Sequence, residues 1–381
     1  MAPKTMRAFA TTNRGIGGTA WKLATRFSIA HDVSVRQFPT PTPSATEVLV
    51  KVKAVAQNVC TFLNSIEYPN LTFLQPTDYK HIDLLGRPNS ILGCDYAGTV
   101  ESVGASAKGN WKVGDRIAGV THGGIYNNRG SYAEYLTIDG DLAWKIPESV
   151  PFTTAAVYGV SAVSAMQALN LVLGLPWPGE KPVEAGKELF IYGGSTSASL
   201  FAIQIAKMAG LRVITTCSPH SNDLVKSYGA DEVYNYKDKS SLQKIKTAHP
   251  DLALAFDGFG GAGSNEFCCN VVANKNGKVV TLDPQAKSAV KGVELETMIM
   301  YTVFGRAFQL VPPIGPKFPV KLEDRAGLAR FYAMLPKLVE EQKLRAPPIQ
   351  LRGSGFDKIE EGLELLKSGK VSGQKLVLEL C

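Results

Sequence analysis

Cysteine is scarce in this sequence, and its few copies are not arranged for metal binding or for disulfide formation. The chain has 381 residues and six cysteines, which are scattered without a C-x-x-C pair. Isolated cysteines in a chain of this size indicate reduced thiols, so we expect a cytoplasmic protein. A structural zinc lobe needs four clustered soft ligands, which are missing, and we expect no bound metal.

Signals for secretion, membrane insertion and nucleic-acid binding are also missing. The N-terminal sequence MAPKTMRAFATT lacks the apolar core of a signal peptide, and no apolar run is long enough to span a bilayer. The net charge of +7 comes without a dense block of lysine and arginine. We therefore expect neither a membrane nor a nucleic acid as partner. The mildly basic surface would suit an anionic cofactor or a carrier protein.

Residues 188–218 carry the clearest structural pattern in the chain. The apolar run 189–192 predicts a buried strand, and the glycine pair that follows it predicts a turn. Apolar residues then recur at helical spacing until Gly210, a residue type that commonly ends a helix. A second strand is expected over residues 212–216, and a strand–turn–helix–strand unit of this kind builds a parallel sheet.

The turn at Gly193 and Gly194 predicts a site for the pyrophosphate of a dinucleotide. The first amides of a helix have no internal partner, and small residues let a phosphate approach them. The G-x-G-x-x-G motif is not intact, so an ordinary tight strand–helix turn remains an alternative. The best candidates for phosphate contact are the hydroxyl residues Ser195, Thr196 and Ser197.

The end of the second strand favours NADPH over NADH. Sites that prefer NAD usually place an acid there, which would repel the 2′-phosphate of NADPH. Residues 217–221 read CSPHS and contain no carboxylate. Ser218, Ser221 and the neighbouring amides could donate to a 2′-phosphate, whereas His220 could equally be an exposed loop residue.

The whole chain divides into a β-rich part and an alternating part. In residues 1–160, short strands and glycine-marked turns follow at close intervals, which predicts a compact β-barrel domain. In residues 161–324, helices alternate with strands, which predicts an α/β fold with a doubly wound parallel sheet. Residues 285–319 are expected to be irregular. The helix–strand tail 325–381 has too little core of its own and is assigned to the β domain.

Three motifs in this order resemble the medium-chain dehydrogenase/reductase superfamily. They are GCDYAGTV at residues 93–100, VGDRIAG at residues 113–119 and GSYAEY at residues 130–135. The resemblance implies a GroES-like β-barrel domain that holds the substrate and catalytic groups, over residues 1–160 and 325–381. It also implies a Rossmann-type NADPH-binding domain over residues 161–324.

The sequence departs from that of zinc alcohol dehydrogenases at two motifs. Both departures are typical of the zinc-free quinone and enoyl reductases within the superfamily. Asn58 occupies the place of the catalytic cysteine of zinc alcohol dehydrogenases, and their G-H-E motif reads G-C-D at residues 93–95. One soft ligand beside a carboxylate does not make a catalytic zinc site. Cys60 and Cys94 are therefore expected to be buried structural thiols.

Within this branch, the chain is most similar to the trans-acting enoyl reductases of fungal polyketide biosynthesis. The similarity is carried by YGGST at residues 192–196, TCSPH at residues 216–220 and LLKSGKVSGQK at residues 365–375. It implies NADPH-dependent reduction of an α,β-unsaturated thioester on the carrier domain of a polyketide synthase. It also implies cofactor contacts at Asn58, Val59, Cys60, Thr61, Gly194, Ser195, Thr196, Ser197, Ala198, Ser218, Pro219, His220, Ser221, Tyr236, Leu282, Asp283, Val371 and Ser372.

The candidate catalytic residues are Asn58, Thr61 and Tyr68. Asn58 and Thr61 could orient the nicotinamide ribose or the substrate, or they could cap a loop. Tyr68 could be a general acid or could face solvent. The N-P-S-D opening of the family reads N-V-C-T at residues 58–61, which predicts altered substrate handling.

Two other functions remain open at this point. One is a free-standing NADPH quinone or enone oxidoreductase of the same fold, and the other is a catalytically altered relative that binds the cofactor. A monomer is expected, because segment 285–319 could block the sheet edge through which zinc-free reductases often pair.

Overall fold

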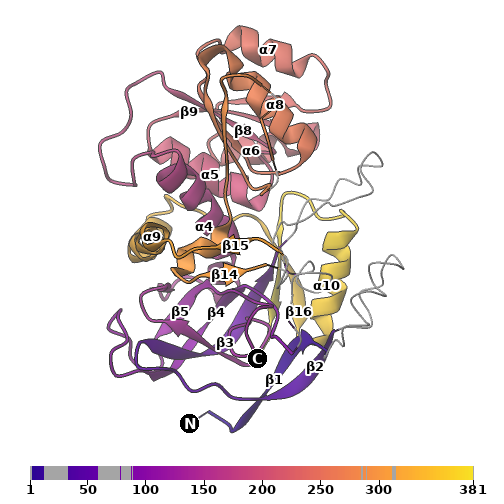
Figure 1. Ribbon diagram of the computed structural model, residues 1–381. Helices are drawn as coiled ribbons and strands as arrows, with labels where there is room; N and C mark the ends of the chain where they lie inside the picture. The colour runs from indigo at the N-terminus through magenta and orange to yellow at the C-terminus, as the bar shows by residue number, and fades with distance from the viewer. Residues whose placement is uncertain are drawn as a thin grey trace.

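The computed structural model describes residues 2–12, 33–58, 78, 87, 89–284, 286–288, 290–310 and 315–380. Figure 1 shows two parts, a lower one built on the N-terminal strands and an upper one in which helices flank a sheet. Strand β16 and helix α10, which belong to the C-terminal segment, lie beside the lower part. The exact positions of the domain boundaries stay predictions.

The lower part is built on a seven-stranded mixed sheet with the order β16-β17-β3-β4-β5-β7, in which β6 also pairs with β3. Gly98 of β4 lies so close to β3 that an added Cβ would be 2.1 Å from the carbonyl oxygen of Lys51, which explains a glycine inside a strand. A separate antiparallel ribbon joins β1 to β2. The strands are β1 (Thr5–Thr11), β2 (Val33–Pro39), β3 (Glu47–Gln57), β4 (Asp95–Val103), β5 (Arg116–Val120), β6 (Tyr135–Asp139), β7 (Ala143–Lys145), β16 (Ile349–Ser354) and β17 (Lys375–Glu379).

The upper part is a six-stranded parallel sheet with the order β10-β9-β8-β11-β12-β13, in which β13 spans Glu294–Thr297. This order, with helices between the successive strands from β8 to β12, confirms the expected doubly wound sheet. Phe190, Ile214 and Ala255 are fully buried at neighbouring positions of the three central strands. The elements are β8 (Glu188–Tyr192), α5 (Ser197–Met208), β9 (Arg212–Cys217), η5 (Pro219–Ser221), α6 (Asn222–Ser227), β10 (Glu232–Asn235), α7 (Ser241–Ala248), β11 (Leu254–Asp257), α8 (Ala262–Val272), η6 (Ala273–Lys275) and β12 (Lys278–Thr281).

A helical segment, Phe152–Val172, links the two parts and corrects one expectation. It is long and apolar enough to cross a membrane, contrary to the prediction that no run of this length exists. Its most apolar window is 83% buried inside the protein, as in the core helix of a globular fold. The segment consists of α3 (Phe152–Ala155), η3 (Ala156–Tyr158), α4 (Val160–Met166) and the π-helical η4 (Gln167–Val172).

The expectation that residues 285–319 are irregular was wrong. β13 (Glu294–Thr297) extends the parallel sheet, and its sequence ELET lacks an apolar pattern because it is an edge strand. Lys278 of β12 forms ion pairs with the two glutamates of β13, at 3.0 and 2.8 Å, which stabilise this pairing. Three further elements follow: η7 (Met300–Phe304), β14 (Phe308–Gln309) and β15 (Lys317–Phe318).

The C-terminal segment contains helices followed by a strand, as the sequence predicts for this tail. Its first helix is α9 (Leu322–Glu340). Glu323 and Asp324 stand in its first turn, where negative charge favours the helix dipole. Helix α10 (Asp357–Lys367) precedes β17.

Candidate active site

A cavity of about 520 Å³ lies between the two parts of the molecule. On one side it is lined by the ends of β8 and β9 and by the turn before α5. On the other side it is lined by the end of β3 and the start of β17. Ligands of open parallel sheets bind beyond the carboxyl ends of the strands, which is where this cavity lies.

Each glycine of the turn between β8 and α5 has its own structural reason. Gly193 has a φ of +73°, in the left-handed region that side chains rarely adopt. An added Cβ on Gly194 would lie 2.3 Å from the hydroxyl oxygen of Thr215, so only glycine lets the turn pack this closely on β9. The glycine pair is therefore explained by the tight turn at Gly193 and by the close packing of Gly194 on β9.

The three hydroxyl residues after these glycines do not play the same role. Thr196 is the N-cap of α5, and its hydroxyl accepts from the Ser199 amide at 3.1 Å and lies 3.1 Å from the carbonyl oxygen of Gly258. The hydroxyl groups of Ser195 and Ser197 line the cavity and form no hydrogen bond within the described part of the chain. Ser195 and Ser197 are therefore the two hydroxyls that this turn offers to a ligand.

The predicted site residues fall into three groups. Those that line the cavity are Asn58, Ser195, Thr196, Ser197, Ala198, Ser218, Tyr236, Leu282, Val371 and Ser372. Those that are described but do not line it are Gly194, Pro219, His220, Ser221 and Asp283. Those that lie outside the described residues are Val59, Cys60, Thr61 and Tyr68.

Strand pairing brings a lysine to the cavity wall beside Asn58. Leu376 of β17 pairs with Gln57 of β3, so the residues that flank this pair, Lys375 and Asn58, are neighbours. The Lys375 ammonium donates to the Asn58 side-chain oxygen and forms an ion pair of 3.2 Å with the Asp95 carboxylate. It also donates to the Ser161 hydroxyl at 3.2 Å. We call Lys375, Asn58, Asp95 and Ser161 the lysine centre.

The lysine centre is almost fully removed from solvent. Lys375 is 3% exposed and Asp95 is 0% exposed, so each charge depends on the other and on nearby dipoles. Asp95 also accepts a hydrogen bond of 2.6 Å from the Val160 amide at the start of α4. Burial raises the pKa of Asp95 above its usual value, although Lys375 opposes this.

A second buried carboxyl group, Asp78, lies behind Asn58. It accepts from the Asn58 amide at 2.9 Å and from the Tyr132 hydroxyl at 2.7 Å. Burial raises the pKa of Asp78 to about 6. The Asn58 backbone and side chain are thus held between two aspartates and a lysine.

Sequence reasoning did not identify Lys375 or Ser161 as site residues. The available signal for Lys375 is a charged residue that directly precedes the apolar run of β17. Ser161 carries no signal of its own, because small hydroxyl residues are common in helices.

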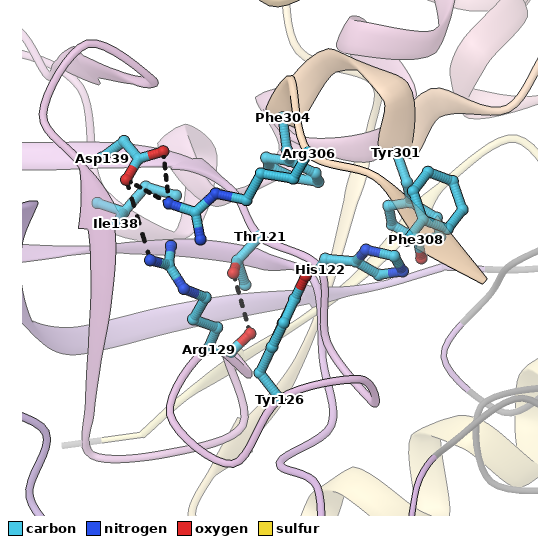
Figure 2. A pocket seen from close by; sticks show the side chains of 10 residues that line it. All are labelled: Thr121, His122, Tyr126, Arg129, Ile138, Asp139, Tyr301, Phe304, Arg306 and Phe308. Atoms are coloured by element: carbon cyan, nitrogen blue, oxygen red, sulfur yellow. Dashed lines mark hydrogen bonds and ion pairs between the residues drawn. The ribbon is translucent and has the colours of Figure 1, made fainter. Parts of the chain in front are cut away.

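Figure 2 shows an aromatic cluster that contains His122, Tyr301, Phe304 and Phe308. The His122 ring stacks on the Tyr301 ring, with centroids 3.7 Å apart, and Phe308 lies edge-on to His122. The Tyr301 hydroxyl is 3.4 Å from the sulfur of Cys94, whose pKa burial raises well above its usual value. The pocket in this cluster has a volume of about 10 Å³, which holds one water molecule and no acyl chain.

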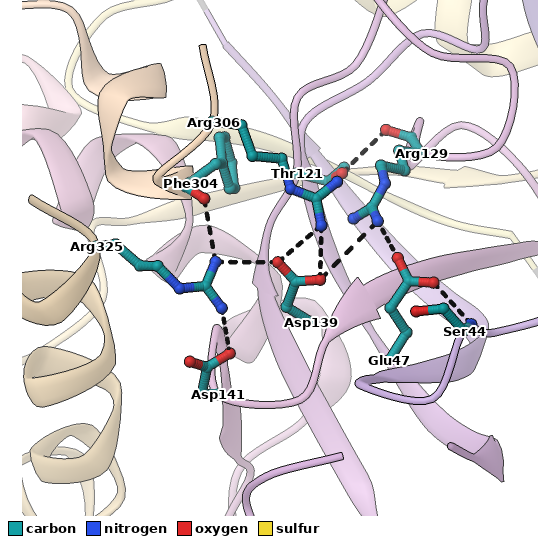
Figure 3. A network of polar contacts seen from close by, with 9 residues as sticks. All are labelled: Ser44, Glu47, Thr121, Arg129, Asp139, Asp141, Phe304, Arg306 and Arg325. Carbon is teal, nitrogen blue, oxygen red and sulfur yellow. Dashed lines mark hydrogen bonds and ion pairs between the residues drawn. The ribbon is translucent and has the colours of Figure 1, made fainter. Parts of the chain in front are cut away.

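An ion network fixes the segment that forms one wall of the cavity (Figure 3). Asp139 at the end of β6 binds Arg306 at 2.8 Å and Arg325 of α9 at 3.0 Å. Met298–Met300, which precede Arg306 in the chain, line the cavity. Each arginine in this network forms an ion pair with a carboxylate. The network therefore holds the cavity wall in place and does not offer a binding site for an anion.

The described residues contain no group of three or more His, Cys, Asp or Glu side chains that could hold a metal ion. Cys94, Cys217, Cys268 and Cys269 are buried and form no disulfide bond. The polar groups that face the cavity are hydroxyls, amides and lysines.

Two family models match the chain. The Alcohol dehydrogenase GroES-like domain matches residues 44–148, and the Zinc-binding dehydrogenase domain matches residues 199–300. The first match confirms the GroES-like assignment of the lower part.

Known proteins resemble the chain over most of its length. Trans-enoyl reductase ACTTS2 of Alternaria alternata is 36% identical over 92% of this chain and 96% of its own. Trans-enoyl reductase TOXD of Cochliobolus carbonum is 41% identical over 66% of this chain and 85% of its own. The quinone oxidoreductase of Coxiella burnetii shares the fold, with a TM-score of 0.66 and 23% identity over 99% of this chain and all of its own. The chain therefore belongs to the trans-enoyl reductases, a family of nicotinamide-dependent oxidoreductases within the medium-chain dehydrogenase/reductase superfamily.

Proposed function

We propose that this chain is an NADPH-dependent enoyl reductase that acts in trans, in the cytoplasm and as a monomer, on an α,β-unsaturated thioester carried by a polyketide synthase. The observation that supports this most strongly is the cavity. It joins a dinucleotide-type turn to a buried lysine centre, whose residues Asn58, Asp95 and Lys375 come from the other part of the molecule.

The charge of the cavity wall is compatible with a phosphorylated dinucleotide. The described residues that line it include Lys367 and no aspartate or glutamate, and the charge of Lys375 is balanced by Asp95. Ser218 follows β9 and Tyr236 follows β10, with their hydroxyl oxygens 3.3 Å apart. This end of the cavity lacks the acid that would repel a 2′-phosphate, which supports NADPH over NADH.

The residues that line the cavity fit a nicotinamide dinucleotide. The cofactor and the protein would each supply a part of the reaction. The cofactor supplies the hydride that is added to the β-carbon of the substrate. Ser195 and Ser197, with the nearby amides, would hold its phosphates. The protein must also place a hydrogen-bond donor near the thioester oxygen, where negative charge develops.

The first test measures binding of NADPH and NADH by fluorescence. NADPH absorbance is then followed after addition of crotonyl-pantetheine or of a small quinone, in separate cuvettes. We expect tighter binding of NADPH and oxidation that depends on the thioester. Oxidation by the quinone alone would instead assign a free-standing quinone oxidoreductase, and binding without oxidation would assign a catalytically altered relative.

A further inference from the structure

The hydrogen bonds of the lysine centre leave one group available to a ligand. An ammonium has three N–H donors. Lys375 directs them to the Asn58 side-chain oxygen, the Asp95 carboxylate and the Ser161 hydroxyl. All of its donors are thus used within the protein, so Lys375 offers none to the cavity that it lines.

Asn58 is also fully engaged. Its side-chain oxygen accepts from Lys375, and its side-chain nitrogen donates to Asp95 at 3.2 Å. The same nitrogen lies 3.5 Å from Asp78. Asn58 therefore supports its neighbours, and its amide is not free to bind a substrate oxygen.

Ser161 differs from both of these residues. Its oxygen accepts from Lys375, while its own O–H proton has no acceptor among the described residues. A helical serine commonly donates to a carbonyl one turn back, but Ser161 makes no such bond within the described helix. Ser161 is 6% exposed and lines the cavity.

We propose that Ser161 is a catalytic residue whose hydroxyl donates a hydrogen bond to the substrate carbonyl oxygen, and that Lys375 is its positioning residue. This inference rests on the enoyl reductase function proposed above. Accepting a hydrogen bond from an ammonium withdraws electron density from the hydroxyl oxygen and makes its O–H a stronger donor. The hydrogen bond therefore strengthens as negative charge develops on the thioester oxygen, without transfer of the serine proton.

Local packing holds Ser161 in this arrangement. Asp95 binds both Lys375 and the Val160 amide, which fixes the start of α4 relative to the ammonium. An added Cβ on Gly159 would lie 2.2 Å from an Asp95 carboxylate oxygen. The approach of α4 to the lysine centre therefore requires glycine at that position.

The test compares Ser161→Ala with the matched control Ser161→Thr, which keeps the hydroxyl. We expect Ser161→Ala to lower kcat for crotonyl-pantetheine about 10- to 100-fold, with little change in KM. Ser161→Thr should retain most of the activity. The NADPH dissociation constant, measured by fluorescence, should be unchanged in both variants, since the hydroxyl contacts the substrate.

The role of Lys375 is tested by a double-mutant cycle. The pair Asp95→Asn and Lys375→Met removes both charges of the ion pair together, so no single buried charge is left. If Lys375 acts through Ser161, this pair should lower kcat less in the Ser161→Ala background than in the wild type. Equal losses in both backgrounds would refute the positioning role. If the charge-free pair does not fold, the two Ser161 variants still decide whether Ser161 is catalytic.

The possible failures can be told apart. A wild-type protein that reduces no thioester would overturn the proposed function, and this inference with it. A wild-type protein that reduces the thioester, with Ser161→Ala equally active, would overturn this inference alone. A loss of NADPH affinity in Ser161→Ala, in parallel with its loss of kcat, would assign the hydroxyl to the cofactor and also overturn it.

Discussion

Replacing Asp78 with asparagine tests how a buried carboxyl group behind the cavity affects stability at different pH values. Asp78 is 1% exposed. Burial raises its pKa from the ordinary 3.8 to about 6, although hydrogen bonds from Tyr132 and Asn58 favour the ionised form. The folded protein therefore holds the Asp78 proton at pH values where the unfolded chain has already released it.

The sign and size of the effect follow from this difference in pKa. A group whose pKa is higher in the folded state contributes stability below its unfolded pKa, and this stability is lost as pH rises through the folded pKa. At about 1.4 kcal/mol per pKa unit, and because pH 4 lies just above the unfolded pKa, Asp78 should lower the free energy of unfolding by about 2 kcal/mol between pH 4 and pH 7. Burial also raises the pKa of Asp257 to about 6, so the wild-type profile contains both contributions.

The assay is equilibrium urea unfolding at pH 4 and pH 7, followed by tryptophan fluorescence and far-UV circular dichroism. The two signals must coincide for one free energy of unfolding to be defined. Asp78→Asn should lose about 2 kcal/mol less than the wild type between the two pH values. Any packing cost of the substitution is the same at both pH values and cancels in this comparison.

Asp238→Asn is the matched control. A hydrogen bond from Ser240 and contact with Lys244 hold the pKa of Asp238 well below its usual range, so it does not titrate between pH 4 and pH 7. This variant should follow the wild-type pH profile. Equal pH profiles for Asp78→Asn and the wild type would refute the reasoning, because they would mean that burial does not raise the pKa of Asp78.

Three further predictions concern the cavity and its walls. Gly194→Ala should weaken NADPH binding and destabilise the protein by about 1–3 kcal/mol in the urea assay, because the added Cβ would contact Thr215 of β9. The control Gly263→Ala should not be destabilising, because no atom lies within 4 Å of the added Cβ. Thr196→Ala should cost about 1 kcal/mol of stability through the lost N-cap, whereas Ser195→Ala should weaken NADPH binding at unchanged stability; the reverse pattern would contradict these roles. Asp139→Asn should destabilise the protein by about 3 kcal/mol in urea unfolding, because its arginine partners lose their shared carboxylate; a variant as stable as the wild type would show that the clamp contributes nothing.

The parallel sheet was predictable because its signals are local. The unit 188–218 combines an apolar strand, a glycine turn and a helical repeat, and each of these depends on residues only a few positions apart. The strand β13 was not predictable in this way. Its sequence ELET is stabilised by backbone pairing with β12 and by ion pairs with Lys278, and neither is visible in a periodicity of apolar residues.

The candidate site was predictable on the cofactor side and less so on the opposite side. Ser195, Ser197 and Ser218 follow strand ends, where the geometry of a parallel sheet places ligands. The lysine centre instead joins residues 58, 95 and 375, which meet through the pairing of β17, β3 and β4, to Ser161 of α4, whose first amide is bound by Asp95. Contacts at such sequence separation leave no local pattern, so Lys375 and Ser161 required the structure.

The composition of the lysine centre shows how this chain uses positions that resemble a zinc site. Asn58 and Asp95 stand where zinc alcohol dehydrogenases have a catalytic cysteine and the acid of their G-H-E motif. In this chain both side chains are bound to the Lys375 ammonium, and Asp95 also binds the amide at the start of α4. A buried lysine thereby places a fixed positive charge at the cavity wall, and its charge is balanced by Asp95 within the same site. Because Asp95 balances this charge, the proposed effect of Lys375 on a substrate passes through the Ser161 hydroxyl, which accepts a hydrogen bond from the ammonium and lines the cavity.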